Sequence, residues 1–182
     1  MIPLGCMAKR VSAGEKLFPA GNIQDIFSFS GCISVPFADY IGYWKDNGYE
    51  LFDSPDIIRA LSEREKIELL GVRFFYYEAH QQEYDRASKT WSDWSPDPNA
   101  TRVIVPEMKS LRGYDVISFH EHTVPQHSPL SCNGLASELP VNEHCLFRSL
   151  EEAKAFLEEG RFDASEPGSF RIVAVYTFTD ER

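Results

Sequence analysis

VRFFYYEA, at residues 72–79, is the stretch that decides the expected fold. Large apolar groups occupy both alternating sets of positions, with Phe74 and Tyr76 on one face of an extended chain and Phe75 and Tyr77 on the other. A strand that is apolar on both faces is typical of the middle of a sheet that is covered on both sides. We therefore expect a central strand here.

Four other stretches are expected to form strands around this one. Residues 170–179 alternate in their two sets of side chains as a half-buried strand does, and they predict a second central or near-central strand. The remaining three expected strands are residues 83–94, 101–105 and 114–122.

Two helices are expected, and each begins at a serine. Ser54 precedes Pro55, and this pair favours a helix start because serine accepts a backbone N–H and proline fits the first turn. Ser149 and Glu152 form a capping box, and the apolar stripe that follows ends at Gly160. The two helix–strand pairs share too few residues for an internal repeat to be predicted.

Length and composition fit one soluble domain. The chain has 182 residues, of which 43% are hydrophobic, so it can bury a core without disulfides. We predict a single α+β domain at residues 23–182, with a mainly antiparallel or mixed sheet and two helices packed on it. Residues 1–22 are expected to be an N-terminal arm or leader with partial order, and translation could begin at Met1 or Met7.

The charge of the chain excludes some partners. Eighteen basic and 28 acidic residues give a formal net charge of −10, and no run of five or more Lys or Arg occurs, so nucleic acid is not an expected partner. No apolar run is long enough to span a membrane, and no membrane partner is expected. The four scattered cysteines and the lack of a secretory signal predict a cytoplasmic location. An acidic surface would suit a protein partner with a basic surface.

Histidine and cysteine concentrate in one long irregular stretch, residues 120–145, which holds four of the five His and two of the four Cys. Long irregular segments in compact domains are usually functional or mobile. Cys132 is a candidate nucleophile, with His127 or His144 as the base that would lower its pKa.

The same stretch contains a candidate metal pair. His120 and His122 are two residues apart at the end of an expected strand, so their rings would point to the same face. Zinc would be the cofactor, although the spacing of the residues matches no zinc signature and does not favour it.

The residues do not establish a function. The chain has no glycine-rich phosphate loop, no Gly-x-Ser-x-Gly and no His-Glu-x-x-His. We therefore expect a small acidic protein-interaction or binding module. The alternative is a small cysteine- or metal-dependent enzyme with its site in the 120–145 loop.

Overall fold

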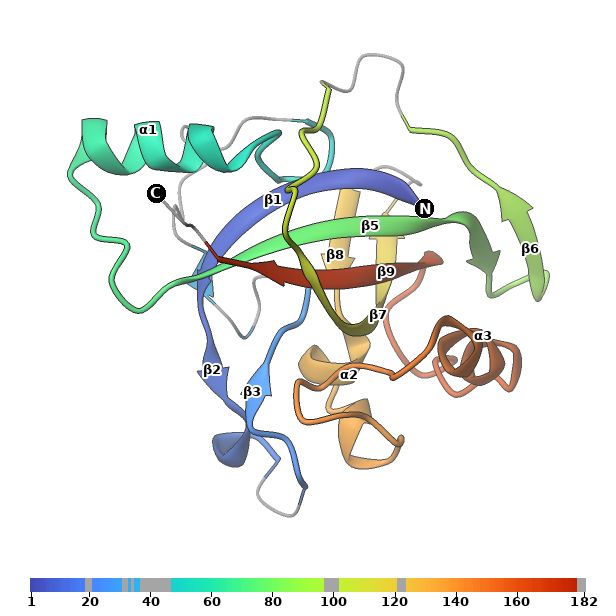
Figure 1. The fold of residues 1–182 in the computed structure, drawn as a ribbon. Coiled ribbons are helices and arrows are strands. Elements are labelled where there is room, and N and C mark those ends of the chain that lie inside the picture. Colours follow the sequence, from blue (N-terminus) through green and yellow to red (C-terminus); the bar gives the residue numbers. More distant parts are fainter. Residues whose placement is uncertain are drawn as a thin grey trace.

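The computed structural model describes residues 1–18, 21–30, 33, 35–36, 47–96, 102–120 and 124–179. These residues form a curled sheet with helices at its flanks (Figure 1). The sheet contains β1 (Ile2–Arg10), β4 (Val35–Pro36), β5 (Arg73–Asp85), β6 (Thr90–Asp93), β7 (Ser110–His120), β8 (Val124–His127) and β9 (Ser169–Phe178). The other elements are β2 (Ser12–Ala13), β3 (Asp25–Ile26), α1 (Pro55–Glu65), α2 (Pro129–Cys132), α3 (Leu150–Glu158) and two short 3₁₀ turns, η1 (Gly14–Lys16) and η2 (Leu135–Ser137).

β5 and β9 form the middle of the sheet, whose strand order is β4-β1-β5-β9-β7-β8, with β6 paired to β5. Every pairing among the described strands is antiparallel. The structure therefore has the predicted α+β architecture, and its described strands form an antiparallel sheet where the sequence left an antiparallel or a mixed sheet open. In the described part of the chain, no helix is long and apolar enough to cross a membrane.

α1 and α3 bury their apolar faces in two different clusters. Ile58 and Leu61 of α1 belong to a cluster with Phe74 of β5. Leu157 of α3 belongs to a second cluster with Ile172 of β9. The structure has a third helix, the single turn of α2, where the sequence predicted only two helices.

The largest difference from the sequence-based expectation lies in residues 1–22. Where an arm or leader was expected, β1 pairs with β5 along most of its length. Gly5 and Lys9 interrupt the apolar pattern that would have indicated a strand, yet Lys9 is buried and Gly5 marks a bulge.

Two other expected strands also differ. The strand expected at 83–94 is the end of β5, a turn and β6. The described part of the strand expected at 101–105 is extended chain without strand pairing. Residues 102–109 instead cross the outer face of the sheet as a strap (Figure 1).

The chain contains two copies of one structural unit. Each copy is a strand with a glycine bulge, a helix and a return strand: β1, α1 and β5 in the first copy, and β7, α3 and β9 in the second. Gly5 pairs with Tyr77, Gly113 pairs with Val175, and Tyr77 pairs with Val175. A pseudo-twofold axis therefore passes through the Tyr77–Val175 pair.

An asparagine closes the first copy, in a segment that we call the first clip (residues 47–52). Asn47 Nδ2 donates to the carbonyl of Leu4 at 2.8 Å, and its Oδ1 accepts from the backbone N–H groups of Tyr49 at 3.0 Å and Leu51 at 3.3 Å. The clip then bridges Cys6 through Phe52. The side chain of Asn47 thus forms hydrogen bonds with three backbone groups that are not paired with a strand.

The second clip (residues 142–147) repeats this geometry. Asn142 Nδ2 donates to the carbonyl of Arg112 at 2.7 Å, and its Oδ1 accepts from the N–H groups of His144 at 2.9 Å and Leu146 at 3.2 Å. Phe147 bridges β7 as Phe52 bridges β1.

The bulge glycines are required for the same reason in both copies. A Cβ on Gly5 would lie 2.7 Å from the Cβ of Leu51, and a Cβ on Gly113 would lie 2.7 Å from the Cβ of Leu146. Their φ angles are +140° and +149°, which side chains rarely adopt.

The equivalence of the clips can be tested with Asn47→Ala and Asn142→Ala. Each change leaves backbone groups without a partner, so each should lower the free energy of unfolding by about 1–3 kcal/mol in urea denaturation. Asn133→Ala, at an exposed position, is the control and should change it by less than about 0.5 kcal/mol. If only one clip variant differed from this control, the two copies would not be equivalent.

Candidate functional site

Cys132, the predicted nucleophile, is half-buried at the end of α2. Its Sγ lies 3.3 Å from Oγ of Ser30 and 3.9 Å from Oγ of Ser131. α2 begins at Pro129, which suits the first helical turn. The described neighbours of this thiol therefore include two hydroxyl groups.

His144, one of its two predicted bases, lies in the second clip. Its ring stacks on Phe27 with centroids 4.1 Å apart, and its Nε2 lies 3.8 Å from Oε1 of Glu143. The described contacts of His144 include no hydrogen bond to Cys132. His127, the other predicted base, is in β8, where its backbone N–H donates to Oγ of Ser118 at 3.3 Å.

The predicted metal pair falls largely outside the described residues. His122 is not among them, and His120 is described only as the last backbone position of β7. Within the described ranges, no three His, Cys, Asp or Glu side chains are placed to hold a metal ion. The zinc hypothesis stays a prediction.

A buried pair of charges holds residues 28–30 against the sheet. Lys9 Nζ donates to the carbonyls of Ser28, at 3.0 Å, and Phe29. Asp115 Oδ2 accepts from the N–H of Phe29 at 2.8 Å, and Ser128 Oγ accepts from the N–H of Ser30 at 3.0 Å. Buried peptide groups outside a strand need such partners, so this clamp also positions Ser30 beside Cys132.

The positions that the pseudo-twofold axis relates to Lys9 and Asp115 carry apolar residues, so the repeated unit forms without a charge there. Counting from the two bulge glycines, Lys9 matches Ile117, and Asp115 matches Met7. Each charged residue thus stands where the other copy has a buried apolar one. Sequence analysis missed both residues, although each interrupts an apolar stretch of its strand.

Burial sets the protonation of Asp115, which is fully enclosed. It raises the pKa of this carboxyl to about 6, although hydrogen bonds from Phe29, Ser128 and Val116 and the charge of Lys9 favour the ionised form.

A groove lies at the end of the sheet where β7 begins. It has a volume of about 710 Å³, and its lining includes Arg73, Lys109 and Arg112. A second hollow of about 320 Å³ adjoins it and shares Glu107 and Met108.

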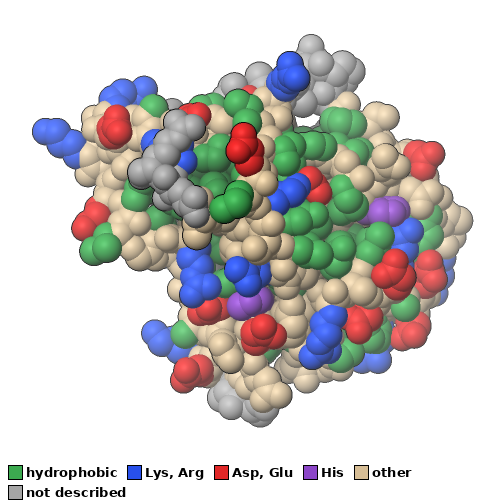
Figure 2. All heavy atoms as spheres, viewed as in Figure 1, with side chains coloured by type: hydrophobic (Ala, Val, Ile, Leu, Met, Phe, Trp, Pro, Cys, Tyr) green, Lys and Arg blue, Asp and Glu red, His purple; other side chains and the backbone are tan. Residues whose placement is uncertain are grey.

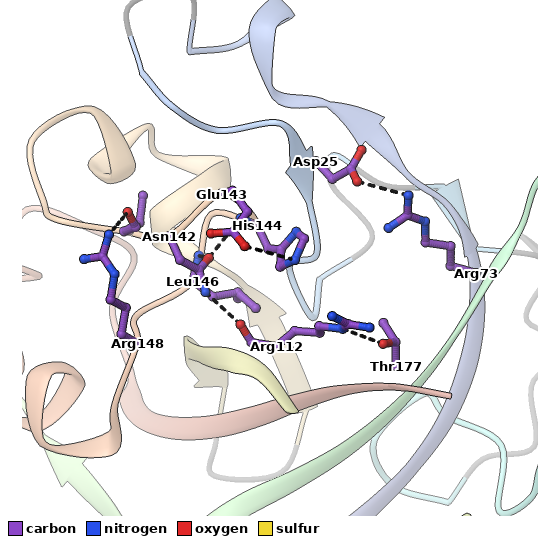
Figure 3. A network of polar contacts seen from close by, with 10 residues as sticks. Asp25, Arg73, Arg112, Asn142, Glu143, His144, Leu146, Arg148 and Thr177 are labelled. Carbon is purple, nitrogen blue, oxygen red and sulfur yellow. Dashed lines mark hydrogen bonds and ion pairs between the residues drawn. The ribbon is translucent and has the colours of Figure 1, made fainter. Parts of the chain in front are cut away.

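A polar network joins the second clip to Arg112, which lines this groove (Figure 3). Arg73 pairs with Asp25 at 3.1 Å, and Arg112 Nε donates to Oγ1 of Thr177 at 2.6 Å. The charges of both guanidinium groups act on His144, and the guanidinium carbon of Arg73 lies 5.1 Å from the centroid of the Phe27 ring on which His144 stacks.

The pKa of His144 is lowered, chiefly because its ring is shielded from water. The positive charges of Arg112 and Arg73 add to this effect, and the carboxylates of Glu143 and Asp25 oppose it. Its Nδ1 is buried and has no hydrogen-bond partner among the described residues.

The strap (residues 102–109) is attached at two points, to the segment that precedes α1 and to the sheet. The N–H of Ile104 donates to the carbonyl of Asp53 at 2.7 Å. Lys109 pairs with Glu78 at 2.5 Å and lies 4.4 Å and 4.3 Å from the ring centroids of Tyr76 and Tyr176. Lys109 thus fixes the end of the strap next to β5 and β9.

Large apolar side chains on and next to the strap are exposed to solvent. Ile104 is 58% and Met108 64% exposed, and Val105 and Leu111 are also exposed. Figure 2 shows hydrophobic side chains gathered on the face of the molecule that β5 and β9 cross.

No family model, no curated protein and no solved structure matches the chain. A function therefore has to be inferred from the groove, the strap and Cys132.

Replacing Asp115 by Asn tests the buried clamp. The pKa of Asp115 is raised in the folded state, so the folded protein retains the proton of this carboxyl between about pH 4 and pH 6. The stability that this protonation contributes is lost as pH rises through that window. Wild-type stability should fall across it by about 3 kcal/mol more than that of Asp115→Asn. Urea denaturation at several pH values measures both profiles, and parallel profiles would refute the assignment.

The environment of Cys132 can be tested by alkylation with iodoacetamide and peptide mapping. Burial raises the pKa of Cys6 to about 12 and also raises that of Cys145, so both should react at least about tenfold more slowly than Cys132 in the folded protein. His144→Ala should leave the rate at Cys132 unchanged, because His144 contacts Phe27 and Glu143. Slower alkylation of Cys132 in that variant would restore His144 as its base.

Proposed function

We propose that the chain is a protein-interaction module that binds an extended segment of a partner protein along the strap and in the adjoining groove. The exposed apolar side chains of Ile104, Val105, Met108 and Leu111 carry this proposal. Apolar side chains exposed together on one surface are typical of interaction sites. Attachment of the strap to the sheet lowers the entropy cost of ordering it on binding.

The charges that line the groove favour an acidic segment. Three cations, Arg73, Lys109 and Arg112, and one carboxylate, Glu107, line it. Arg73 pairs with Asp25 and Lys109 with Glu78, whereas no carboxylate is among the described partners of Arg112. The expectation of a partner with a basic surface rested on the net charge of −10, so such a surface would have to lie outside the bound segment. The proposed partner segment therefore combines apolar and acidic side chains.

The cysteine-dependent enzyme has less support. The described contacts of the His144 side chain are with Phe27 and Glu143 and include no hydrogen bond to Cys132, and the described neighbours of Cys132 include the hydroxyls of Ser30 and Ser131. The interaction module fits a cytoplasmic setting, because the buried thiols of Cys6 and Cys145 suit a reducing compartment.

Selection from a display library of random 12-residue peptides tests the proposal. Bound peptides should be enriched in sequences that combine large apolar and acidic residues. The double change Ile104→Glu and Met108→Glu should weaken their binding at least about tenfold, because it places charges where apolar contacts form.

Leu70→Glu is the matched control, since Leu70 is 79% exposed and lies outside the strap. It should leave peptide affinity within about twofold. Failure to enrich peptides, or peptides that bind the strap variant as tightly as the wild type, would contradict the proposal.

A further inference from the structure

Two arginines that line the groove, Arg73 and Arg112, act electrostatically on His144, and the three residues come from different parts of the chain. Arg73 begins β5, Arg112 lies in β7 next to a bulge glycine, and His144 belongs to the second clip. Figure 3 shows the three side chains in one region but separated from one another, each with its own partner: Asp25 for Arg73, Thr177 for Arg112 and Glu143 for His144. Asn142 fixes two of them, since it bonds the carbonyl of Arg112 and the N–H of His144.

The guanidinium of Arg112 has donors left for a ligand. Its described side-chain contact uses Nε alone, toward Thr177, and no carboxylate is among its described partners. Arg73 already pairs with Asp25, although half of its side chain remains exposed. A guanidinium presents paired N–H groups that match the oxygens of a carboxylate or a phosphate.

The first clip has the same geometry without an arginine or a histidine at the equivalent positions, so the clip does not require Arg112 or His144. Leu4 stands at the position of Arg112, and Tyr49 stands at the position of His144. Leu4 and Tyr49 are buried, whereas Arg112 is exposed and faces the groove.

The mate of Arg73 shows what such an arginine binds inside the protein. Arg171, which matches Arg73 by strand register, donates from Nε and Nη2 to the carboxylate of Glu83 at 3.0 Å and 2.9 Å. Two arginines with a histidine thus occur on one side of the pseudo-twofold axis only, where Arg73 belongs to the first copy and Arg112 and His144 belong to the second, and both arginines line the groove.

We infer that the place between Arg73, Arg112 and His144 is an oxyanion-binding site, which takes a carboxylate or phosphate group of the bound segment. The source of the anion rests on the proposed function, whereas the site itself does not. It supplies the acidic part of the recognition, and the strap supplies the apolar part.

His144 couples this binding to pH. Its ring faces Arg73 and Arg112, which disfavour its protonation, and Asp25 and Glu143, which favour it. An anion between the arginines would offset their charge, so His144 should gain a proton as the anion binds. Binding should therefore strengthen as pH falls through the titration of this histidine.

Titration of the His144 ring by NMR tests the site without any peptide. Inorganic phosphate and acetate are added separately, against sodium chloride at the same ionic strength. At least one of the two anions should raise the pKa of His144 by about one pH unit relative to chloride. A response to phosphate alone would identify a phosphorylated segment, and a response to acetate would identify a carboxylate.

Arg112→Gln should abolish the response, while Arg148→Gln is the matched control. The guanidinium of Arg148 contacts the carbonyl of Val141 on the other side of the second clip (Figure 3). No response to either anion, or an equal response in Arg112→Gln, would overturn the inference. Because no peptide is present, failure of the site is distinguishable from failure of docking on the strap.

Discussion

The antiparallel pairing of β5 with β9 is the interaction on which the rest of the structure depends. It joins the two copies of the unit at Tyr77 and Val175, and β1 and β7 then add to its two sides with matching register. The pairing is built from large apolar side chains on both faces, so it can be covered on both sides. The asparagine clips follow from it, because each closes the outer strand of one copy.

The differences between the two copies indicate where function resides. A symmetric frame would keep apolar residues at the positions of Lys9 and Asp115, and it would need neither Arg112 nor His144 at the second clip. Lys9 and Asp115 hold residues 28–30 in place, whereas Arg112 lines the groove and its charge acts on His144. The strap adds a further asymmetric feature, since it crosses the outer face just before β7.

Local patterns predicted the elements whose residues signal them directly. β5 and β9 follow from the apolar residues of 72–79 and 170–179, and α3 follows from Ser149, whose side chain accepts from the N–H of Glu152 as expected. α1 begins at Pro55 as expected, but the side chain of Ser54 makes no capping hydrogen bond. β1 was missed because Gly5 and Lys9 have partners far along the chain, which a local pattern cannot show. The duplication was missed because the copies share backbone geometry and a few clip residues.

Of the candidate site, sequence analysis found only part. It selected His144 as a rare residue but assigned it to Cys132, since nearness in sequence does not report nearness in space. Arg73 and Arg112 carry no signal by themselves, because single arginines are common on exposed surfaces. The strap was expected as a strand because apolar residues at 103–105 resemble one, and only the structure shows that Ile104 and Val105 face solvent.

Native-state hydrogen exchange of backbone amides tests the equivalence of the two copies most directly. The N–H of Phe52 bonds the carbonyl of Cys6 at 2.9 Å, and the N–H of Phe147 bonds that of Tyr114 at 2.9 Å. If the copies are equivalent, these two amides should open with free energies within about 1 kcal/mol of each other. Exchange of one at the rate of an exposed loop, while the other stays protected, would contradict the account.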